Sequence, residues 1–281
     1  MTKDKTSLAR KFIPSVTADL AHSKWNIVMV GAGGTGSHTV PHLARMMATP
    51  GLASQRIGSL TVVDHDRVEH QNVGRQLFIT QDVGKHKAEV LAVRYSLAFG
   101  LSIAYINEKV IRGTIKKDGK ISTGSFRQPT LIIGAVDNAK GRRAIFNAIK
   151  NSNKKREAVY WFDAGNALDV GQVAWGNTAD HKKVLAEIDR PLIEFVPYPP
   201  LLFPNLLKNE QKPGPSCAEA IEAEEQGPNI NAQMGVLLAE MIRKFLIGQL
   251  DIHYTVIDFK YMRMSSQPLT SKWLRKCAMP D

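Results

Sequence analysis

The chain has 281 residues, 43% of them hydrophobic, which is within reach of one large α/β domain. Its formal net charge of +11 raises the question of nucleic-acid binding, but the charge is spread over short runs without an RNP-like or zinc-finger pattern. We interpret it as a solvated basic surface that attracts anionic ligands and acidic partners. Two cysteines, no signal-peptide pattern and no long apolar run exclude a disulfide framework and predict a cytoplasmic protein without a membrane segment.

We expect a basic N-terminal extension over residues 1–24 and a single domain over residues 25–281, with its nucleotide-binding part at about residues 25–150. The first predicted strand, residues 27–30, leads directly into a glycine-rich turn. Glycines there let a phosphate approach the backbone without meeting a Cβ atom, and residues 37–47 have the pattern of a helix whose start suits an anion. The glycines are Gly31, Gly33, Gly34 and Gly36. Alone, this turn indicates a nucleotide or a dinucleotide site.

The second predicted strand, residues 60–63, ends in Asp64, which is placed to hydrogen-bond ribose hydroxyls. Further polar residues follow at Asp66, Asn72 and Gln76. The planar guanidinium of Arg75 suits a polyphosphate, and Lys87 adds a cation at the expected start of the next helix. Two cations beside the glycine turn favour a triphosphate attacked at its α-phosphorus over the pyrophosphate of a dehydrogenase cofactor.

A buried strand is predicted over residues 130–136 and is followed by Asp137, Asn138 and Arg142. An aspartate at this end of a strand faces the ligand crevice of a doubly wound sheet and can hold the Mg²⁺ that accompanies ATP. The alternative is that Asp137 caps the next helix. We favour the ligand role, although one residue can do both.

Later segments concern partners more than chemistry. Residues 160–177 predict two short strands around a turn, which a simple hairpin also explains. The proline-rich residues 185–209 show no clear period, and we expect an ordered insertion at a dimer or partner surface. Residues 230–246 predict a helix, and residues 253–260 alternate like a strand that can join the sheet.

Cys217 lies in a Pro-Gly-Pro-Ser-Cys stretch, which predicts an exposed, irregular loop suited to a nucleophile. A lone cysteine is more often an inert small hydrophobic residue, so both interpretations stay open. Cys277, beside Lys276, is interpreted as incidental.

Together these motifs resemble the ThiF/MoeB/E1-like adenylating enzymes over roughly residues 25–248. The matching residues are Gly31, Gly33, Gly34, Gly36, Asp64, Asp66, Val68, Asn72, Arg75, Gln76, Gly84, Lys87, Asp137, Asn138 and Arg142. The resemblance implies a Rossmann-like, doubly wound, mostly parallel sheet with helices on both faces. Many relatives bind zinc through two Cys-x-x-Cys pairs, which this chain lacks, so we predict no zinc ribbon.

The resemblance further implies that ATP-Mg²⁺ binds and that the C-terminal glycine carboxylate of a small ubiquitin-like or sulfur-carrier β-grasp protein is adenylated. It assigns Asp64 to ribose, Asn72, Arg75 and Gln76 to ribose and phosphates, Lys87 to the α-phosphate and Asp137 to Mg²⁺. Asp66, Asn138, Arg142 and the four glycines complete the expected ATP site. The resemblance also places Asp163, Gly165 and Asn166 near the tail of the carrier protein, with a simple β-hairpin as the alternative.

In such enzymes a cysteine in a crossover loop, here about residues 205–228, forms a thioester, acyl-disulfide or persulfide with the carrier, and Cys217 matches that position. In related homodimers an N-terminal arginine reaches the partner's γ-phosphate. Arg10 is the candidate here, although it is closer to Gly31 in sequence than expected. We therefore expect a homodimer. The chain is also similar to ThiF-family members of bacterial mobile-element clusters called PRTRC systems.

Other functions stay open. A NAD-dependent oxidoreductase leaves Asn72, Arg75, Gln76 and Lys87 unexplained. A ThiF-like ATPase acting on tRNA, a peptide-adenylating enzyme, or a non-catalytic scaffold half of an E1-like dimer remains an alternative. The presence of Arg75, Lys87 and Asp137 argues against the scaffold.

Overall fold

The computed structural model describes residues 11–12, 24–109, 129–150, 158–188, 190, 192–208 and 228–279. Among these residues, eight strands form the main sheet, in the order β10-β9-β7-β6-β5-β2-β3-β4. They are β2 (Trp25–Val30), β3 (Ile57–Val63), β4 (Ala104–Ile106), β5 (Thr130–Gly134), β6 (Val159–Asn166), β7 (Val170–Gly176), β9 (Ile252–Asp258) and β10 (Arg263–Pro268). Strands β1 (Lys11–Phe12) and β8 (Leu192–Ile193) form a separate parallel pair.

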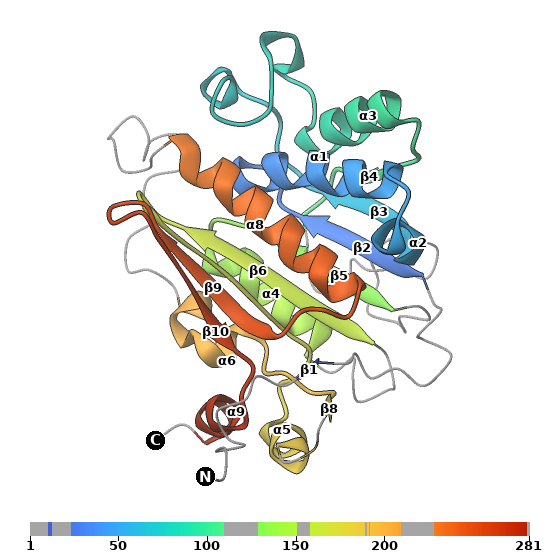
Figure 1. Ribbon diagram of the computed structural model, residues 1–281. Helices are drawn as coiled ribbons and strands as arrows, with labels where there is room; N and C mark the ends of the chain where they lie inside the picture. Colours follow the sequence, from blue (N-terminus) through green and yellow to red (C-terminus); the bar gives the residue numbers. More distant parts are fainter. Residues whose placement is uncertain are drawn as a thin grey trace.

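The helices of the described residues are α1 (Gly34–Ala48), α2 (Leu52–Arg56), α3 (Lys87–Phe99), α4 (Ala139–Ile149), α5 (His181–Glu187), α6 (Pro199–Leu202), α8 (Pro228–Leu246) and α9 (Ser271–Ala278). Short 3₁₀ turns are η2 (His70–Asn72), η3 (Thr80–Asp82) and η5 (Pro204–Leu207). Helices α1 and α8 cross one face of the sheet, and α4 lies behind it (Figure 1). None of the helices described is long and apolar enough to cross a membrane.

Strands β4, β3, β2, β5 and β6 run parallel, whereas β7, β9 and β10 continue the sheet in antiparallel fashion. The chain builds outward from β2 to β3 and β4, and then returns to place β5 on the other side of β2. This reversal is the topological switch point at which open α/β sheets bind ligands. The predicted doubly wound, mostly parallel α/β fold is confirmed.

Alternate residues of the central strands feed two cores. Tyr160 and Phe162 of β6 pack into the cluster on the α1 and α8 face, whereas Val159 and Trp161 pack into the cluster beneath α4. The same alternation runs along β2 and β5, as expected for strands covered on both faces. Burial on both faces fixes the strand register, and with it the edge at which the strands end.

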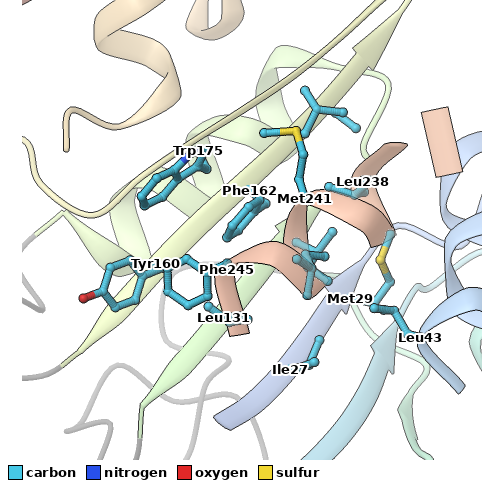
Figure 2. Packing of buried hydrophobic residues seen from close by; sticks show 14 of the residues in the cluster. Ile27, Met29, Leu43, Leu131, Tyr160, Phe162, Trp175, Leu238, Met241 and Phe245 are labelled. Atoms are coloured by element: carbon cyan, nitrogen blue, oxygen red, sulfur yellow. The ribbon is translucent and has the colours of Figure 1, made fainter. Parts of the chain in front are cut away.

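An aromatic cluster joins α8 to the sheet. The Phe245 ring of α8 lies 5.0 Å from Tyr160, 5.6 Å from Phe162 and 5.6 Å from Trp175, measured between ring centroids. Figure 2 shows these rings with Met241 and Leu238 of the same helix facing the strands. Rings at such separations add to the stability gained by burying their apolar area. The packing therefore holds α8 firmly across the strands that carry the candidate site.

Several expected elements are present with small differences in their bounds. Residues 160–177 do form a hairpin, and its strands β6 and β7 belong to the main sheet. The strand expected at residues 253–260 is β9, which pairs with both β7 and β10. The described part of the proline-rich segment contains β8, α6 and η5. Residues 263–278 form β10 and α9, neither of which was predicted from the sequence.

His253 is fully buried at the centre of a hydrogen-bonded chain. A carbonyl oxygen only accepts hydrogen bonds, so the Nε2–H of His253 donates to the Pro197 carbonyl, at 3.1 Å. The Nδ1 of the same ring accepts the Trp273 indole N–H at 2.9 Å. Both nitrogens are thus used by the neutral ring. Burial lowers the pKa of His253 to about 4, and backbone hydrogen bonds to Pro197 and Trp175 oppose the shift.

We expect this histidine to make stability depend on pH. The unfolded chain binds a proton near pH 6.5 but the folded chain only near pH 4, so stability is complete above pH 6.5 and falls by up to about 3 kcal/mol as the pH drops to 4. The free energy of unfolding is measured by urea denaturation at several pH values. His253→Gln is expected to make it less dependent on pH between 4 and 6.5, whereas His70→Gln, at an exposed position, should leave that dependence unchanged. Equal slopes in wild type and His253→Gln would contradict this explanation.

Candidate functional site

Three of the four glycines in the turn are required by close packing. Gly31 has a φ of 93°, and a Cβ atom there would lie 2.5 Å from the Ala135 carbonyl oxygen. A Cβ on Gly36 would lie 1.9 Å from the Gly31 carbonyl oxygen, and one on Gly34 would lie 2.6 Å from Oδ1 of Asn231. These glycines let β2, β5, α1 and α8 approach one another at the switch point.

Gly33 differs from its neighbours because a Cβ there would meet nothing closer than Nε2 of Gln76, at 3.9 Å. The position faces open space where α1 begins. The first α-helical bond runs from the Ser37 N–H to the Gly33 carbonyl, so the preceding N–H groups have no partner within the helix. This space and these donors fit an anionic group such as a phosphate.

Asp64 ties the glycine turn to the end of β3. Its carboxylate accepts the Ala32 N–H at 2.6 Å and the Asp66 N–H at 2.8 Å. Burial raises the pKa of Asp64, and these two hydrogen bonds oppose the shift. Lys87 begins α3, as expected, with its Nζ 3.7 Å from Asp66. A carboxylate and an ammonium group therefore lie at the same end of β3.

The segment with Asn72, Arg75 and Gln76 is held against α1. Asn72 is buried, and its Oδ1 accepts the Glu69 N–H at 2.9 Å. The Leu77 N–H donates to Oγ of Ser37 at 3.2 Å, and the His38 ring hydrogen-bonds the Arg75 backbone. Among the described residues, the buried Oε1 of Gln76 has no hydrogen-bond donor. A ligand hydroxyl or amino group at this place would satisfy it.

Two different residues after β5 take the capping role and the candidate ligand role. Asn138, not Asp137, caps α4, and its Oδ1 accepts the Gly141 N–H at 2.8 Å. The exposed Asp137 carboxylate accepts the Asn138 side-chain amide at 2.8 Å, which orients it at the edge of the sheet. The alternative that Asp137 caps the helix is therefore wrong, and its role as a ligand for Mg²⁺ stays a prediction.

Arg142 points into the protein beneath this edge. Its Nε lies 3.0 Å from Oδ2 of Asp163, and its Nη2 donates to the Ala164 carbonyl at 3.2 Å. Burial raises the pKa of Asp163 to about 6 and outweighs the opposing effect of the Arg142 charge. The geometry favours a positioning role for Arg142, which anchors α4 to β6, over the direct ATP contact predicted from sequence.

Two places among the described residues could hold a divalent cation. One is Asp137 at the end of β5. The other combines Asp64, His65 and Asp66 after β3, where one ligand atom from each residue lies within 4.8 Å of the others. The Nε2 of His65 is 3.1 Å from Asp66. A cation that also contacts a nucleotide phosphate is better placed at Asp137, because Asp64 already binds the glycine turn.

Two predicted site residues, Cys217 and Arg10, lie outside the described residues. The other cysteine, Cys277, is buried in α9, and burial raises the pKa of its thiol to about 12. A thiol with this pKa is not ionised at neutral pH, which agrees with its interpretation as incidental.

A polar cluster lies beside the glycine turn. From the sequence, only its Asn166 was expected near the carrier tail, and Thr35 and Asn231 were not singled out. Thr35 in the first turn of α1, Asn166 at the end of β6 and Asn231 near the start of α8 are linked by hydrogen bonds. A signal was available, because two asparagines begin an otherwise apolar helix after a Gly-Pro pair. Only the folded arrangement brings them to the turn.

Comparisons with known proteins agree with this geometry. A model of the ThiF family matches residues 6–277. Human ubiquitin-like modifier-activating enzyme 7 is 47% identical over 66 residues, which are 23% of this chain and 6% of that protein. Ubiquitin-like modifier-activating enzyme 5 of Aedes aegypti is 27% identical over 147 residues, which cover 50% of this chain and 33% of that protein. The chain thus spans a third or less of these relatives.

Among solved structures, Escherichia coli MccB in complex with ATP has the same fold. It is 18% identical to this chain, with a TM-score of 0.52 over 89% of this chain and 65% of MccB.

Proposed function

The chain belongs to the ThiF family, which groups it with the E1-like adenylating enzymes, and we propose that it uses ATP to adenylate the C-terminal carboxylate of a small ubiquitin-like or sulfur-carrier β-grasp protein. One observation carries the proposal. The open space at Gly33, the Lys87 cation and the Asp137 carboxylate all lie where β2, β3 and β5 end, at the switch point of the sheet. Free N–H donors, an ammonium group and a carboxylate at this edge support the binding of a nucleoside triphosphate together with Mg²⁺.

In the proposed reaction, a carboxylate oxygen of the acceptor attacks the α-phosphorus of ATP. A bond forms between this oxygen and the α-phosphorus, the bond from the α-phosphorus to the bridging oxygen breaks, and pyrophosphate leaves. No general base is needed, because the carboxylate is already ionised at neutral pH. The chain contributes position and charge stabilisation.

Each residue has a defined task in this proposal. Asp64 accepts ribose hydroxyls, and the α1 start at Gly33 receives phosphate oxygens. Arg75 and Lys87 stabilise the charge that develops on the phosphates. Mg²⁺, held at Asp137, would neutralise part of the triphosphate charge. Gln76 would pair its buried Oε1 with the nucleotide.

Two residues outside the described part of the chain, Cys217 and Arg10, also have roles in the proposed function. Cys217 is proposed to attack the acyl adenylate through its thiolate, so that a thioester to the carrier forms and AMP leaves. Arg10 is proposed to reach the nucleotide of a partner subunit in a homodimer. The complex of MccB with ATP supports ATP as the nucleotide. A ThiF-like ATPase acting on a peptide or tRNA, or a scaffold half of an E1-like dimer, is the competing function.

Intact-mass measurement of the carrier tests this function. The β-grasp protein encoded nearest to the gene is incubated with the chain, ATP and Mg²⁺, and we expect it to gain the mass of AMP. Asp137→Ala should abolish the gain, whereas Asp169→Ala, at a turn of the β6–β7 hairpin, should not. Cys217→Ala should leave the adenylate unchanged and remove only a covalent enzyme–carrier product. An unmodified carrier with wild-type enzyme would contradict the proposal for that acceptor.

A further inference from the structure

The cluster of Thr35, Asn166 and Asn231 lies on the opposite flank of the glycine turn from the nucleotide residues of β3. Strands β3 and β6 are separated by β2 and β5 in the sheet, and α8 packs over α1 on the β6 side (Figure 1). Asp64 and Lys87 thus approach the turn from one side, and Asn166 and Asn231 from the other. In a reaction that joins a nucleotide to a carboxylate, this second flank is available to the acceptor.

Asn231 is anchored by one atom of its amide. Its Oδ1 accepts the Asn166 side-chain N–H at 3.0 Å and faces Oγ1 of Thr35 at 3.4 Å, while Thr35 also lies 3.3 Å from Oδ1 of Asn166. The residue is only 3% exposed. The amide lies against the first turn of α1, since a Cβ on Gly34 would be 2.7 Å from Nδ2.

The Nδ2 group of Asn231 has no hydrogen-bond acceptor among the residues that the structure describes. An amide N–H without an acceptor in the protein is open to an acceptor atom of a ligand, because most polar groups of native proteins are paired. Here the unused donor lies beside the N–H groups at the start of α1. Both observations call for an electronegative ligand atom at the same place.

We propose that the Nδ2 of Asn231 donates to the acyl oxygen of the acceptor, which is the carboxylate before the reaction and the acyl phosphate carbonyl after it. This assignment rests on the proposed function and adds the acceptor subsite to it. The chemistry suits a nucleophile, because a neutral amide orients the carboxylate without the charge neutralisation that a lysine or arginine would impose. The new bond joins this carboxylate to the α-phosphorus while pyrophosphate departs, and no proton moves.

Two nucleoside probes isolate this contact. Adenosine 5′-sulfamate occupies the nucleotide position alone, and 5′-O-(N-glycylsulfamoyl)adenosine adds an acyl group in place of the acceptor. The ratio of their dissociation constants, measured by isothermal titration, reports the acyl contact. We expect wild type to bind the glycyl compound more tightly, and the ratio to fall by about tenfold or more in Asn231→Asp and Asn231→Leu.

The variants control for each other and for folding. Asn231→Asp keeps the Oδ1 anchor and replaces the donor, Asn231→Leu removes the donor without adding charge, and Asn229→Asp adds the same charge at an exposed position of α8. The sulfamate affinity should stay within about threefold in all of them. A ratio that is the same in wild type and both Asn231 variants, or that falls equally in Asn229→Asp, would overturn the assignment.

The outcome also separates this assignment from the proposed function. A wild-type chain that bound neither compound would contradict the nucleotide site itself. If both compounds bound and the ratio of their dissociation constants were the same with and without the Asn231 side chain, only the acceptor subsite would be overturned. The proposed adenylation would not be affected.

Discussion

Lys87→Met is expected to slow adenylate formation by about two to three orders of magnitude, which is the effect of losing one well-placed electrostatic group in a water-poor site. Lys87 begins α3, its side chain is 10% exposed, and its nearest charged partner is Asp66 at 3.7 Å. This separation leaves the ammonium able to interact with a phosphate oxygen. The rate is measured as single-turnover pyrophosphate release at saturating ATP.

Lys85→Met is the matched control for this change. It removes the same charge two residues earlier, from an exposed side chain, and should reduce the rate less than about threefold. Similar losses in the two variants would mean that general attraction of ATP to a basic surface, not a specific contact, explains the effect. An unchanged rate in Lys87→Met would contradict its assignment to the α-phosphate.

Gly36→Ala is expected to destabilise the fold by roughly 3 kcal/mol or more, because the new Cβ would lie 1.9 Å from the Gly31 carbonyl oxygen and only backbone movement can relieve that overlap. Gly33→Ala should instead leave the fold nearly as stable as wild type, since the atom nearest to the new Cβ would be Nε2 of Gln76 at 3.9 Å. Its added methyl group occupies the proposed phosphate position, so ATP affinity should fall at least tenfold.

Thermal denaturation and ATP titration of both variants check this contrast. We expect Gly36→Ala to lose mainly stability and Gly33→Ala to lose mainly affinity for ATP. If Gly33→Ala bound ATP like wild type, the phosphates would have to lie elsewhere along the edge of the sheet. If Gly36→Ala were as stable as wild type, the close packing described for the turn would be wrong.

Sequence reasoning succeeded where short segments carry their own pattern. The apolar run before Gly31, the aspartate at the end of β3 and the lysine at the start of α3 are local features, and the structure brings these ends together because parallel strands end at the same edge. The hairpin of β6 and β7 was expected on the same basis. Local spacing was sufficient for the nucleotide half of the site.

The rest of the site depends on contacts between distant parts of the chain. Thr35 and Asn231 are 196 positions apart, and their proximity follows from the packing of α8 across α1, which no local pattern specifies. The same limit applies to Arg142, whose predicted contact with ATP followed from the motif alone, whereas the structure pairs it with Asp163. Gly34 was assigned to phosphate binding, whereas the structure also requires it to admit the Asn231 amide.

The bond of ATP that is broken tests the central claim most directly. The chain is incubated with Mg²⁺ and the β-grasp protein encoded nearest to its gene, using ATP labelled at the α-phosphorus in one reaction and at the γ-phosphorus in another. Attack at the α-phosphorus predicts labelled AMP, free or bound to the carrier, from the first, and labelled pyrophosphate from the second, both dependent on the carrier and on Lys87. Labelled ADP and inorganic phosphate would show cleavage at the γ-phosphorus and would contradict adenylation.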